Sequence, residues 1–598
     1  MIKKRKSLGI GFKDELSNIT VQSSHFKKQK DVDWKDALLP NYEPFVEGPK
    51  NSWRVAILFC LSVIVFFTIF LKLFHLQVAK GSDNRNLAEG NRIQIKKIHA
   101  PRGVIYDRND KILAANSPGF RLIEGEKIRH ISRDDAIKME VNGDPRFVNL
   151  EIDSLRDYPF KEITSHLLGY VGEITSDELK KSQFSDYNSG DRIGRGGVEE
   201  EYEKDLRGTD GGEVIEVDSS GKKVRTLRTV DPIPGESLHL TIDGDLQKIT
   251  FEKLTNEITK SGSCCGAAIV QELATGGILT LVSIPGFNPD EISLYLGAPH
   301  SPMLNRAIAG LYPPGSVFKI ASSLAGLSSG KITPETNFED TGVINLGPFT
   351  FANWYFTQHG KTEGMVNMVK ALQRSNDIYF YRLGQTVGED ALGQSAKKLG
   401  LGQGSNIDIP GEVSGIIPDN DWKVKNMGEV WYPGDTLHMS IGQGFVTVTP
   451  LEISTMISTI AVGQEFAPHI NSKKNVSGKK LDFKKEDLVV IRQGLAEVPK
   501  NGGTAWPFFT FPITSAGKTG TAEFGDPKGR THAWYAAYAP ADDPKISATV
   551  LIEAGGEGST NASPVVKEIF RWFFSPDKND LIKDGVIEAT AAARTLGE

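Results

Sequence analysis

The sequence predicts an α/β protein of the α+β kind, in which an antiparallel sheet is sandwiched by helices and preceded by a β-rich segment and one membrane helix. Three observations predict this fold. Strand-like segments stand at both ends of residues 236–577, with helical segments between them. Short extended stretches separated by turns fill residues 79–235. One uncharged apolar run, Val55–Leu71, has the length of a membrane span.

Composition narrows the class of protein. The 598 residues exceed a single compact fold and allow about three to five domains. Hydrophobic residues make up 39% and charged residues 24%, which excludes a mostly disordered chain and a protein with many membrane spans. A net charge of −6 argues against nucleic acid as a partner.

The cysteines and two isolated histidines do not indicate a metal site. Three cysteines exclude a disulfide-rich scaffold and a zinc cluster built from cysteines. Cys60 lies in the apolar run, and we expect Cys264 and Cys265 to be small core residues, because neighbours in sequence rarely form an unstrained disulfide. Neither His359 nor His532 has a second nitrogen ligand at helical spacing. No metal or other cofactor is therefore expected.

The apolar run is interpreted as a retained anchor over residues 53–78. The alternatives are a buried core helix and a cleaved signal peptide, whose apolar part is usually shorter and nearer the N-terminus. Basic residues before the run, including Lys3–Lys6 and Arg54, favour a cytoplasmic N-terminus, although lysines and arginines also follow it. We expect a flexible cytoplasmic arm at 1–52, a single span in the cytoplasmic membrane, and residues 79–598 outside the cytoplasm.

Residues 79–235 are expected to form an extended membrane-proximal domain, called the pedestal below. Alternating apolar side chains at 92–98 predict a strand. The glycine-rich stretch at 194–212 predicts a turn, a short acidic helix and a second turn. The density of Pro and Gly in Asp231–Gly235 predicts the boundary, and residues 236–254 predict a strand that enters a helix through an aspartate-rich turn.

The second domain, residues 236–577, alternates strands and helices. Two apolar runs at 266–273 and 277–284 flank a short turn and predict a hairpin. The C-terminal tail at 578–598 carries no strong pattern. The remaining expected elements are a buried helix at 316–328, three successive strands at 513–524, 532–540 and 545–554, and an amphipathic closing helix at 563–574.

The sharpest chemical feature is the stretch from Tyr312 to Lys319. Two prolines and a glycine make a rigid turn before an apolar helix, so Ser316 lies near a helix N-terminus with Lys319 one turn on, on the same face. A nucleophile, an amine within reach and free backbone N–H groups suit acyl transfer. A capping serine with a solvated lysine gives the same spacing by chance, but the apolar neighbours of Lys319 weigh against solvation.

Two further motifs make the combination specific. Ser375-Asn376-Asp377 follows a helical segment, and Lys518-Thr519-Gly520-Thr521 lies on a predicted strand, where Gly520 lets another backbone approach closely. A Ser-x-x-Lys element, a short serine–asparagine element and Lys-Thr-Gly, in this order, form the active-site set of β-lactamases and penicillin-binding proteins. The triple is far more specific than any one of its members.

On these residues the chain resembles the class B penicillin-binding proteins, serine D,D-transpeptidases of bacterial cell-wall synthesis. It is most similar to their elongation branch, the penicillin-binding protein 2 group, because Tyr312 and Thr519 stand where division-specific relatives usually have Phe and Ser. The resemblance extends from about residue 50 to residue 575. It is carried by residues 303–319, 431–452 and 518–524, and in the pedestal, a dimerisation-type domain, by Ala100–Gly103, Asp107, Arg108, Gly197, Glu199 and Leu206–Gly208.

The resemblance implies acyl transfer through a serine ester. Ser316 would attack the penultimate D-Ala carbonyl of a stem peptide, release D-Ala and pass the acyl group to an amine of a neighbouring peptide. Lys319 would be the base, its pKa lowered by burial or by Lys518, and Ser375 would relay a proton to the leaving amine. The N–H groups of Ser316 and Thr521 would form the oxyanion hole. The implied substrate-binding residues are Asn376, Asp377, Thr519, Gly520 and Thr521, with Lys518 beside the substrate carboxylate.

Asp377 departs from the commonest family pattern, which has Asn at this place. An ionised carboxylate near Lys319 would favour protonated lysine and oppose its role as base. Either Asp377 points elsewhere, or it is hydrogen-bonded and protonated; we expect it to position substrate or motifs. Among the other polar residues, Asp435 is expected to cap a turn, and Arg102, Asp107 and Arg108 to form a structural salt-bridge cluster in the pedestal, with contact to a partner as the alternative.

Three functions remain open from the sequence. The first is a cross-linking transpeptidase of elongation, inhibited covalently by β-lactams, with a division-specific transpeptidase as its variant. The second is a D,D-carboxypeptidase or β-lactamase, although no base for a deacylating water can be identified. The third is a non-catalytic penicillin sensor or scaffold, although residues 1–52 show no folded signalling domain. The resemblance implies peptidoglycan stem peptides as substrates, and a RodA-like glycosyltransferase and other elongation-complex proteins as partners.

Overall fold

The computed structural model describes residues 52–84, 92–124, 127–218, 223–474 and 476–576. The expected cytoplasmic arm, apart from Ser52, and the expected C-terminal tail lie outside the described residues. The chain divides into two compact units, residues 1–92 and residues 93–598.

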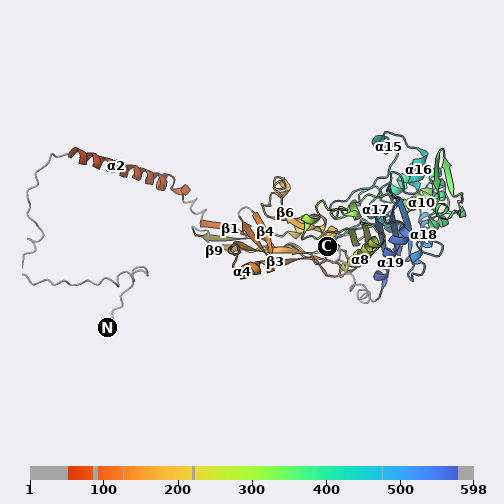
Figure 1. Cartoon of the computed structure of the whole chain (residues 1–598), viewed down its shortest axis with the longest axis horizontal. Coiled ribbons are helices and arrows are strands. Elements are labelled where there is room, and N and C mark those ends of the chain that lie inside the picture. The colour runs from red at the N-terminus through yellow and green to blue at the C-terminus, as the bar shows by residue number, and fades with distance from the viewer. Residues whose placement is uncertain (1–51, 85–91, 125–126, 219–222, 475, 577–598) are drawn as a thin grey trace, which may run out of the picture. The chain divides into compact units, whose positions relative to one another are not determined.

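The first unit contains a long apolar helix, labelled α2 in Figure 1. Helix α2 (Ser52–Phe74) continues into a short π-helical turn, η1 (His75–Ala79). The 27 residues Trp53–Ala79 are long and apolar enough to cross a membrane, and this is the one such helix in the described part of the chain. Its side chains are exposed along its length, so they require an apolar surrounding to cover them.

The pedestal is built from antiparallel strands. The 13-residue strand β3 pairs along one edge with β4, its hairpin partner, and along the other with β5. β8 pairs with β1 and β9 in a separate three-stranded sheet. The strands are β1 (Ile93–Ile98), β2 (Ile105–Tyr106), β3 (Ile112–Glu124), β4 (Lys127–Ser132), β5 (Leu150–Asp157), β6 (Tyr170–Glu173), β7 (Arg192–Arg195), β8 (Gly211–Val217) and β9 (Lys223–Val230).

Short helices complete the pedestal. In the stretch 194–212, where the sequence predicts a turn, one short acidic helix and a second turn, strand β7 ends at Arg195 and the acidic segment forms two short helices, α6 and α7. β10 (Leu238–His239), which follows the Pro- and Gly-rich segment, pairs in parallel with β2 and so joins the start of the second domain to the pedestal sheet. The helices are α4 (Arg133–Val141), η2 (Pro145–Asn149), η3 (Lys161–Ile163), α5 (Ser165–Leu168), η4 (Ser182–Phe184), α6 (Gly197–Glu201) and α7 (Glu203–Leu206).

Arg102, Asp107 and Arg108 of the pedestal do not form the single salt-bridge cluster expected from the sequence. Arg102 pairs with Glu199 and Glu203, whereas Arg108 pairs with Glu272 of the second domain. The buried carboxylate of Asp107 accepts backbone N–H groups from Asn109, Lys111 and Gly244 instead of pairing with either arginine. The expectation failed because backbone N–H groups of its own turn and of Gly244 satisfy the Asp107 carboxylate.

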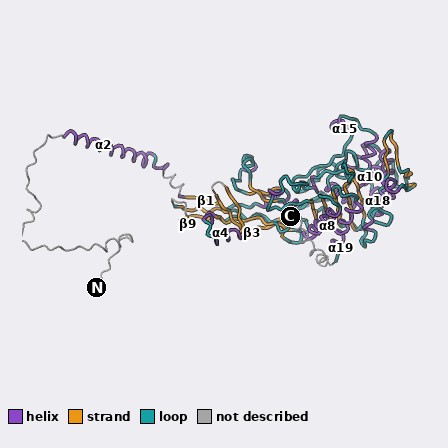
Figure 2. Tube along the Cα trace, viewed as in Figure 1, coloured by secondary structure: helices purple, strands orange, loops and turns teal. Residues whose placement is uncertain are grey.

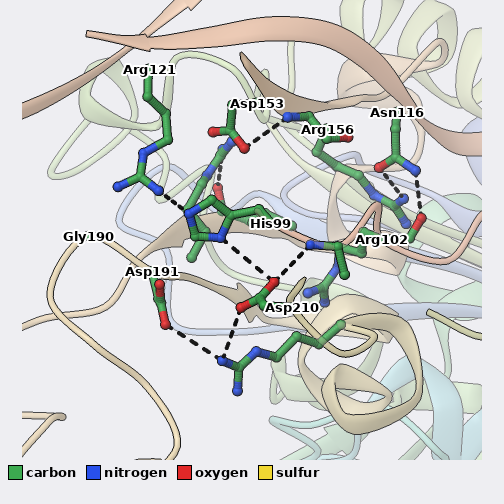
Figure 3. Close-up of a pocket in the computed structure, with 14 residues that line it drawn as sticks. His99, Arg102, Asn116, Arg121, Asp153, Arg156, Gly190, Asp191 and Asp210 are labelled. Atoms are coloured by element: carbon green, nitrogen blue, oxygen red, sulfur yellow. Dashed lines mark hydrogen bonds and ion pairs between the residues drawn. The ribbon is translucent and has the colours of Figure 1, made fainter. Parts of the chain in front are cut away.

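A different ionic cluster lies in the pedestal around Glu199. Its side chain is fully buried and accepts from Arg102 Nε at 2.5 Å and from Arg156 Nε at 2.7 Å. Burial acts to raise the pKa of Glu199, but the charges of Arg102 and Arg156 outweigh it and lower that pKa below its ordinary value. Figure 3 shows the adjoining small cavity, where Arg102 and Arg156 lie with His99, Asn116 and Arg121.

The second domain contains the expected antiparallel sheet, in the order β12–β11–β21–β20–β19. The predicted hairpin forms β11 and β12, and the three predicted C-terminal strands form β19, β20 and β21, paired in succession. Figure 2 shows helices crowding this domain, whereas strands predominate in the pedestal. The strands are β11 (Gly266–Glu272), β12 (Ile278–Ile284), β19 (Ala516–Glu523), β20 (Thr531–Ala539) and β21 (Ile546–Ile552).

Helices cover both faces of this sheet, as the sequence predicts. Along β20, Trp534, Ala536 and Tyr538 join the core on one face, and the residues between them, such as Tyr535, join the core on the other, because side chains alternate along a strand. Helices α8 (Gly244–Lys260) and α19 (Ser563–Phe574) pack in the core on the Tyr535 face. The core on the Trp534 face includes residues of α10 (Lys319–Ser328), α12 (Met368–Arg374), α13 (Asp377–Val387), α14 (Glu389–Lys398), α17 (Pro450–Val462) and α18 (Lys485–Glu497).

Smaller elements surround the helices. They are η5 (Ile292–Leu294), α9 (Arg306–Ala309), η6 (Gly315–Phe318), α11 (Trp354–His359), α15 (Asn420–Met427), α16 (Pro433–Ser440), η7 (Trp506–Phe508), η8 (Gly558–Ala562), and the strand pairs β13 (Phe338–Asp340) with β16 (Gly364–Val366), β14 (Val343–Leu346) with β15 (Phe349–Ala352), and β17 (Gln464–Glu465) with β18 (Lys479–Lys480).

The expectation for the adjacent cysteines is wrong. Cys264 and Cys265 form a disulfide, with their Cα atoms 3.7 Å apart. They lie in the turn between α8 and β11, not in the strand itself, so their side chains are not forced to opposite faces as they would be in extended backbone. Cys265 is buried and Cys264 half-buried.

Candidate active site

The turn that carries Ser316 is fixed from several sides. Tyr312 exchanges backbone hydrogen bonds of 2.9 Å with Val448, and Gly315 N donates to Gly442 O at 2.9 Å. The indole N–H of Trp534, on β20 next to the edge strand β19, donates to Pro313 O at 3.0 Å. Ser316 is the second residue of the 3-10 turn η6, and it remains half-exposed between buried neighbours. The sequence therefore builds a rigid bend that presents a hydroxyl at a helix start.

This bend packs directly against strand β19. Gly315 has φ = +53°, and a Cβ added there would lie 2.8 Å from Thr521 O. A Cβ on Gly520 would lie 2.9 Å from Val317 Cγ2 and 3.1 Å from Pro314 O. Both glycines permit this close backbone approach, as the sequence predicts for Gly520. The Ser-x-x-Lys and Lys-Thr-Gly motifs consequently lie side by side.

Lys319 opens α10 and is completely buried. Its Nζ donates to the carbonyl of Ser375 at 2.8 Å, and lies 3.3 Å from Ser375 Oγ and 2.6 Å from Asp377 Oδ1. The first and second motifs, separated by 56 residues, thus meet at one amine.

Ser375 lies in the short connection between α12 and α13. Its backbone is left-handed, with φ = +56°, which is unusual for a residue other than glycine. This conformation points both its carbonyl and its hydroxyl at Lys319. Such local strain persists only where the surrounding contacts determine it, and it is common at functional sites.

Asn376 and Asp377 hold the second motif in place. Asn376 Oδ1 caps α13 by accepting from Tyr379 N at 3.0 Å, and its Nδ2 donates to Asp340 at 2.9 Å. Asp377 Oδ2 accepts from Trp354 N at 2.9 Å, while its Oδ1 faces Lys319. Asp377 therefore does not point elsewhere, and both of its oxygens bind protein groups.

The electrostatics of the two lysines follow from burial. Burial lowers the pKa of Lys319, whereas the charge and the hydrogen bond of Asp377 act to raise it. Lys518 is also completely buried, and burial together with the charge of Lys319 places its pKa well below the ordinary value. The main cause of the lowered pKa of Lys319 is thus burial, and it is the charge of Lys319 that contributes to the shift of Lys518.

The third motif runs along β19, an edge strand of the sheet. Thr521 is exposed, whereas Thr519 is buried and lies 2.7 Å from Thr504 through the two hydroxyl oxygens. Lys518 Nζ donates to Thr519 O at 3.1 Å. An edge strand with an exposed threonine beside the Ser316 turn can accept an extended peptide by strand addition.

One supporting residue escaped the sequence reasoning. The buried carboxylate of Asp340 accepts from the side-chain amides of Asn353 and Asn376, both at 2.9 Å, and from Glu363 N at 3.0 Å. It orients the two asparagines that shape the second motif. No local pattern marked it, because its partners are distant in the sequence.

The lesser candidates have structural roles. Asp435 caps the start of α16, as expected, by accepting from Tyr432 N at 2.7 Å, and it also pairs with Lys423. His532 packs in stacked contact with Phe524, and its Nδ1 accepts from Ala554 N.

Comparisons with known proteins agree with this geometry. The family described as penicillin binding protein transpeptidase domain matches residues 266–571, and the penicillin-binding protein dimerisation domain matches residues 124–240. The chain is 29% identical to the peptidoglycan D,D-transpeptidase MrdA of Haemophilus influenzae, over 90% of this chain and 94% of the relative.

Solved structures give the same result. Penicillin-binding protein 2 of Helicobacter pylori, in complex with MreC, is 29% identical with a TM-score of 0.68, over 80% of this chain and 98% of that one. A chain of a peptidoglycan synthase complex that coordinates polymerization and crosslinking is 28% identical with a TM-score of 0.69, over 89% and 100% of the two chains. With its fold, its three converging motifs and the family match over half its length, the chain belongs to the penicillin-binding protein transpeptidase family.

Proposed function

We propose that this chain is a peptidoglycan D,D-transpeptidase of cell-wall elongation, and that Ser316 is its nucleophile. The observation that carries the proposal is the buried amine of Lys319, one turn after Ser316 and hydrogen-bonded to the second motif. The kinship with MrdA supports the elongation role over a division-specific one. Penicillin binds to the same serine in this proposal.

Acylation begins when Lys319, in its uncharged form, takes the proton of the Ser316 hydroxyl. The serine oxygen then bonds to the penultimate D-Ala carbonyl, and the tetrahedral oxyanion accepts hydrogen bonds from the N–H groups of Ser316 and Thr521. Collapse breaks the C–N bond to the terminal D-Ala, whose nitrogen receives a proton through Ser375. The second half-reaction reverses these proton transfers, with an amine of a neighbouring stem peptide attacking the ester.

The Lys-Thr-Gly strand binds the donor peptide. Lys518, Thr519 and Thr521 are assigned to the substrate carboxylate, and the edge of β19 with Gly520 to its backbone. The buried amide of Asn376 is occupied by Tyr379 and Asp340, which supports a positioning role for this residue. The two-sided contacts of Asp377 support a positioning role for it as well, through Lys319 and Trp354.

A hydrolase on the same fold is the second candidate. A β-lactamase needs a base placed for the deacylating water, and the acid groups described at this site, Asp340 and Asp377, are each engaged by protein donors. This favours a long-lived acyl-enzyme and therefore a transpeptidase.

The apolar helix at Trp53–Ala79 supports a membrane-anchored enzyme. We place the N-terminus in the cytoplasm and the second unit outside it, on the grounds of the basic residues before the span. The solved relatives, one bound to MreC and one within a peptidoglycan synthase complex, support an MreC-like protein and a RodA-like glycosyltransferase as partners.

Mass spectrometry of the penicillin-treated protein tests the proposal. We expect one penicilloyl group, on the peptide that contains Ser316, and no adduct on Ser316→Ala. Slow loss of the label is expected of a transpeptidase and excludes a β-lactamase, whereas rapid loss identifies a β-lactamase. Labelling at another residue, or full cross-linking by Ser316→Ala, would refute the assignment.

A further inference from the structure

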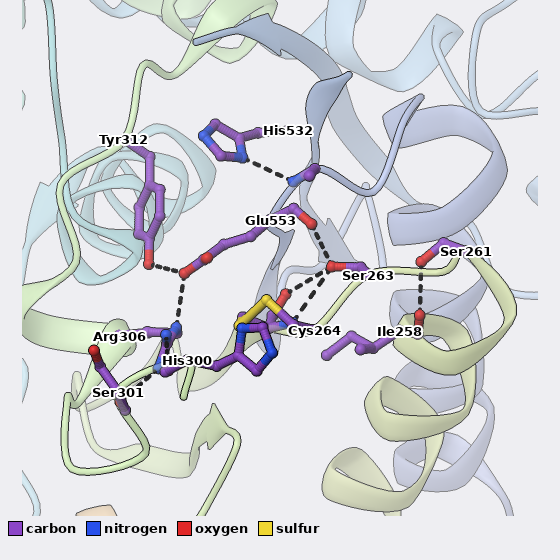
Figure 4. Close-up of a disulfide and its surroundings, with 12 residues drawn as sticks. Ile258, Ser261, Ser263, Cys264, His300, Ser301, Arg306, Tyr312, His532 and Glu553 are labelled. Atoms are coloured by element: carbon purple, nitrogen blue, oxygen red, sulfur yellow. Dashed lines mark hydrogen bonds and ion pairs between the residues drawn. A yellow bond between two sulfur atoms is a disulfide. The ribbon is translucent and has the colours of Figure 1, made fainter. Parts of the chain in front are cut away.

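The disulfide between Cys264 and Cys265 lies beside a histidine from a distant loop. One ligand atom each from Cys264, Cys265 and His300 lies within 4.8 Å of the others. Figure 4 shows the imidazole of His300 next to the bridged sulfurs. Cysteine and histidine are the preferred zinc ligands of proteins.

The histidine side of this group is held by buried contacts. Arg306, 4% exposed, donates from Nη2 to His300 O at 2.5 Å and from Nη1 to Ser301 O at 3.1 Å. His300 and Ser301 both have positive φ, +64° and +47°. The guanidinium therefore stabilises a turn that two non-glycine residues rarely adopt, and this turn presents His300 to the sulfurs.

The cysteine side is anchored to the same scaffold. Glu553 N donates to Cys265 O at 2.9 Å, and the hydroxyl of Ser263 donates to Glu553 O. The carboxylate of Glu553 accepts from Arg306 Nε at 2.7 Å. Glu553 thus contacts both the cysteine segment and Arg306, which holds the His300 turn. The relative position of the sulfurs and the imidazole is therefore set by the fold.

We propose that Cys264, Cys265 and His300 form a redox-gated site for a thiophilic divalent cation such as Zn²⁺. A dithiol reductant cleaves the S–S bond, leaving two cysteine thiols and an oxidised, disulfide-bonded reductant. The thiols then release two protons, and both thiolates and the neutral imidazole bind the cation. The oxidised pair lacks thiolates, so only the reduced protein binds.

The geometry fits this coordination. Tetrahedral zinc with ligands at its usual bond lengths places them about 3.6–3.8 Å apart. The three ligand atoms already lie within 4.8 Å of one another, so shifts of about 1 Å suffice once the sulfurs separate. Three protein ligands leave a fourth position for water or for another donor.

Cobalt titration of the reduced full-length protein tests the site. Cys60→Ser serves as background, because it leaves this pair as the chain's remaining cysteines. After reduction with dithiothreitol and anaerobic desalting, we expect one equivalent of Co²⁺ to give cobalt–thiolate absorption, which one equivalent of Zn²⁺ abolishes. The oxidised protein should give no such band.

Two histidine variants locate the third ligand. His300→Asn should weaken Co²⁺ and Zn²⁺ binding at least about tenfold. His359→Asn changes another exposed histidine of the domain, and this variant should bind as the background protein does. Unchanged melting temperatures establish that both variants fold. Absence of the thiolate band in the reduced protein, binding by the oxidised protein, or full affinity in His300→Asn would each overturn the proposal.

Discussion

At the scale of single residues, the chemistry depends on how Lys319 is balanced between burial and Asp377. Burial disfavours its charged form, and the carboxylate 2.6 Å away favours that form. The carboxylate also accepts from Trp354 N, which fixes its direction. Asp377 therefore holds the lysine amine in position and acts to raise its pKa, against the effect of burial.

Asp377→Asn tests this balance. The substitution removes an interaction that raises the pKa of Lys319, so that pKa should fall further. In the proposed mechanism the base acts in its uncharged form, so the rate of acylation rises with pH through this pKa. The rising part of the rate–pH profile should therefore move to lower pH in the variant. The measurement is the second-order rate of labelling by fluorescent penicillin across a pH series.

The control for this variant is Asp435→Asn, which removes a carboxylate from a helix cap outside the motifs. The rate–pH profile of this control should rise at the same pH as that of the parent. If Asp377→Asn keeps both the rate and the pH profile of the parent, Asp377 has no positioning role.

At the scale of elements, the site exists because the turn before α10 and strand β19 touch at two glycines. An alanine at 520 would bring its Cβ to 2.9 Å from Val317 Cγ2 and 3.0 Å from Trp534 Cβ, both in the core. Gly520→Ala should therefore cost about 1–3 kcal/mol of unfolding free energy and slow penicillin labelling strongly, because the nucleophile turn must shift.

Gly393→Ala is the matched control. Its Cβ would meet Met439 and Ile417 at the ordinary distances of 3.7 and 3.8 Å, within α14. Alanine favours helix over glycine by about 1 kcal/mol, so this variant should be as stable as the parent or more so. Denaturant unfolding of both variants measures the difference, and equal stabilities would contradict the packing argument.

The pedestal elements are joined by Glu199. Glu199→Gln leaves Arg156 without its buried counter-charge and Arg102 with Glu203 alone, which should cost about 3–5 kcal/mol. The pKa of Glu199 is lowered by folding, so its contribution is present above the unfolded pKa and is lost as pH falls through the folded one. Thermal unfolding at neutral and acidic pH should show that the difference in melting temperature between parent and variant becomes smaller in acid. A difference that does not change with pH would contradict the ionic role.

At the scale of the whole molecule, the chain separates into an apolar N-terminal helix and a compact unit of residues 93–598. All three motifs and both cores of the sheet lie in the second unit. Deletion of residues 1–92 should therefore give a protein that stays in solution without detergent and is labelled by penicillin as fast as the parent. Sedimentation with membranes, followed by labelling, measures both properties, and an aggregated or unlabelled product would disprove this independence.

Local pattern was sufficient for much of this protein. The hairpin at β11 and β12, the three closing strands and α19 follow from side-chain pattern, because each of these elements buries one or both of its own faces. The apolar helix follows from an uncharged run of the right length. The three motifs identified the family because their occurrence together, in this order, is far more specific than any one of them. These features are encoded by residues close together in the chain.

Tertiary structure decided what depends on distant partners. The sequence could not show that Asp377 faces Lys319, that Asp340 orients Asn353 and Asn376, or that Glu199 rather than Asp107 pairs with Arg102. It also gave the wrong expectation for Cys264 and Cys265, because the backbone direction at a turn is set by the packing of α8 and β11 on either side. Charges and thiols act over a few ångströms in space, and the fold alone determines which of them come that close.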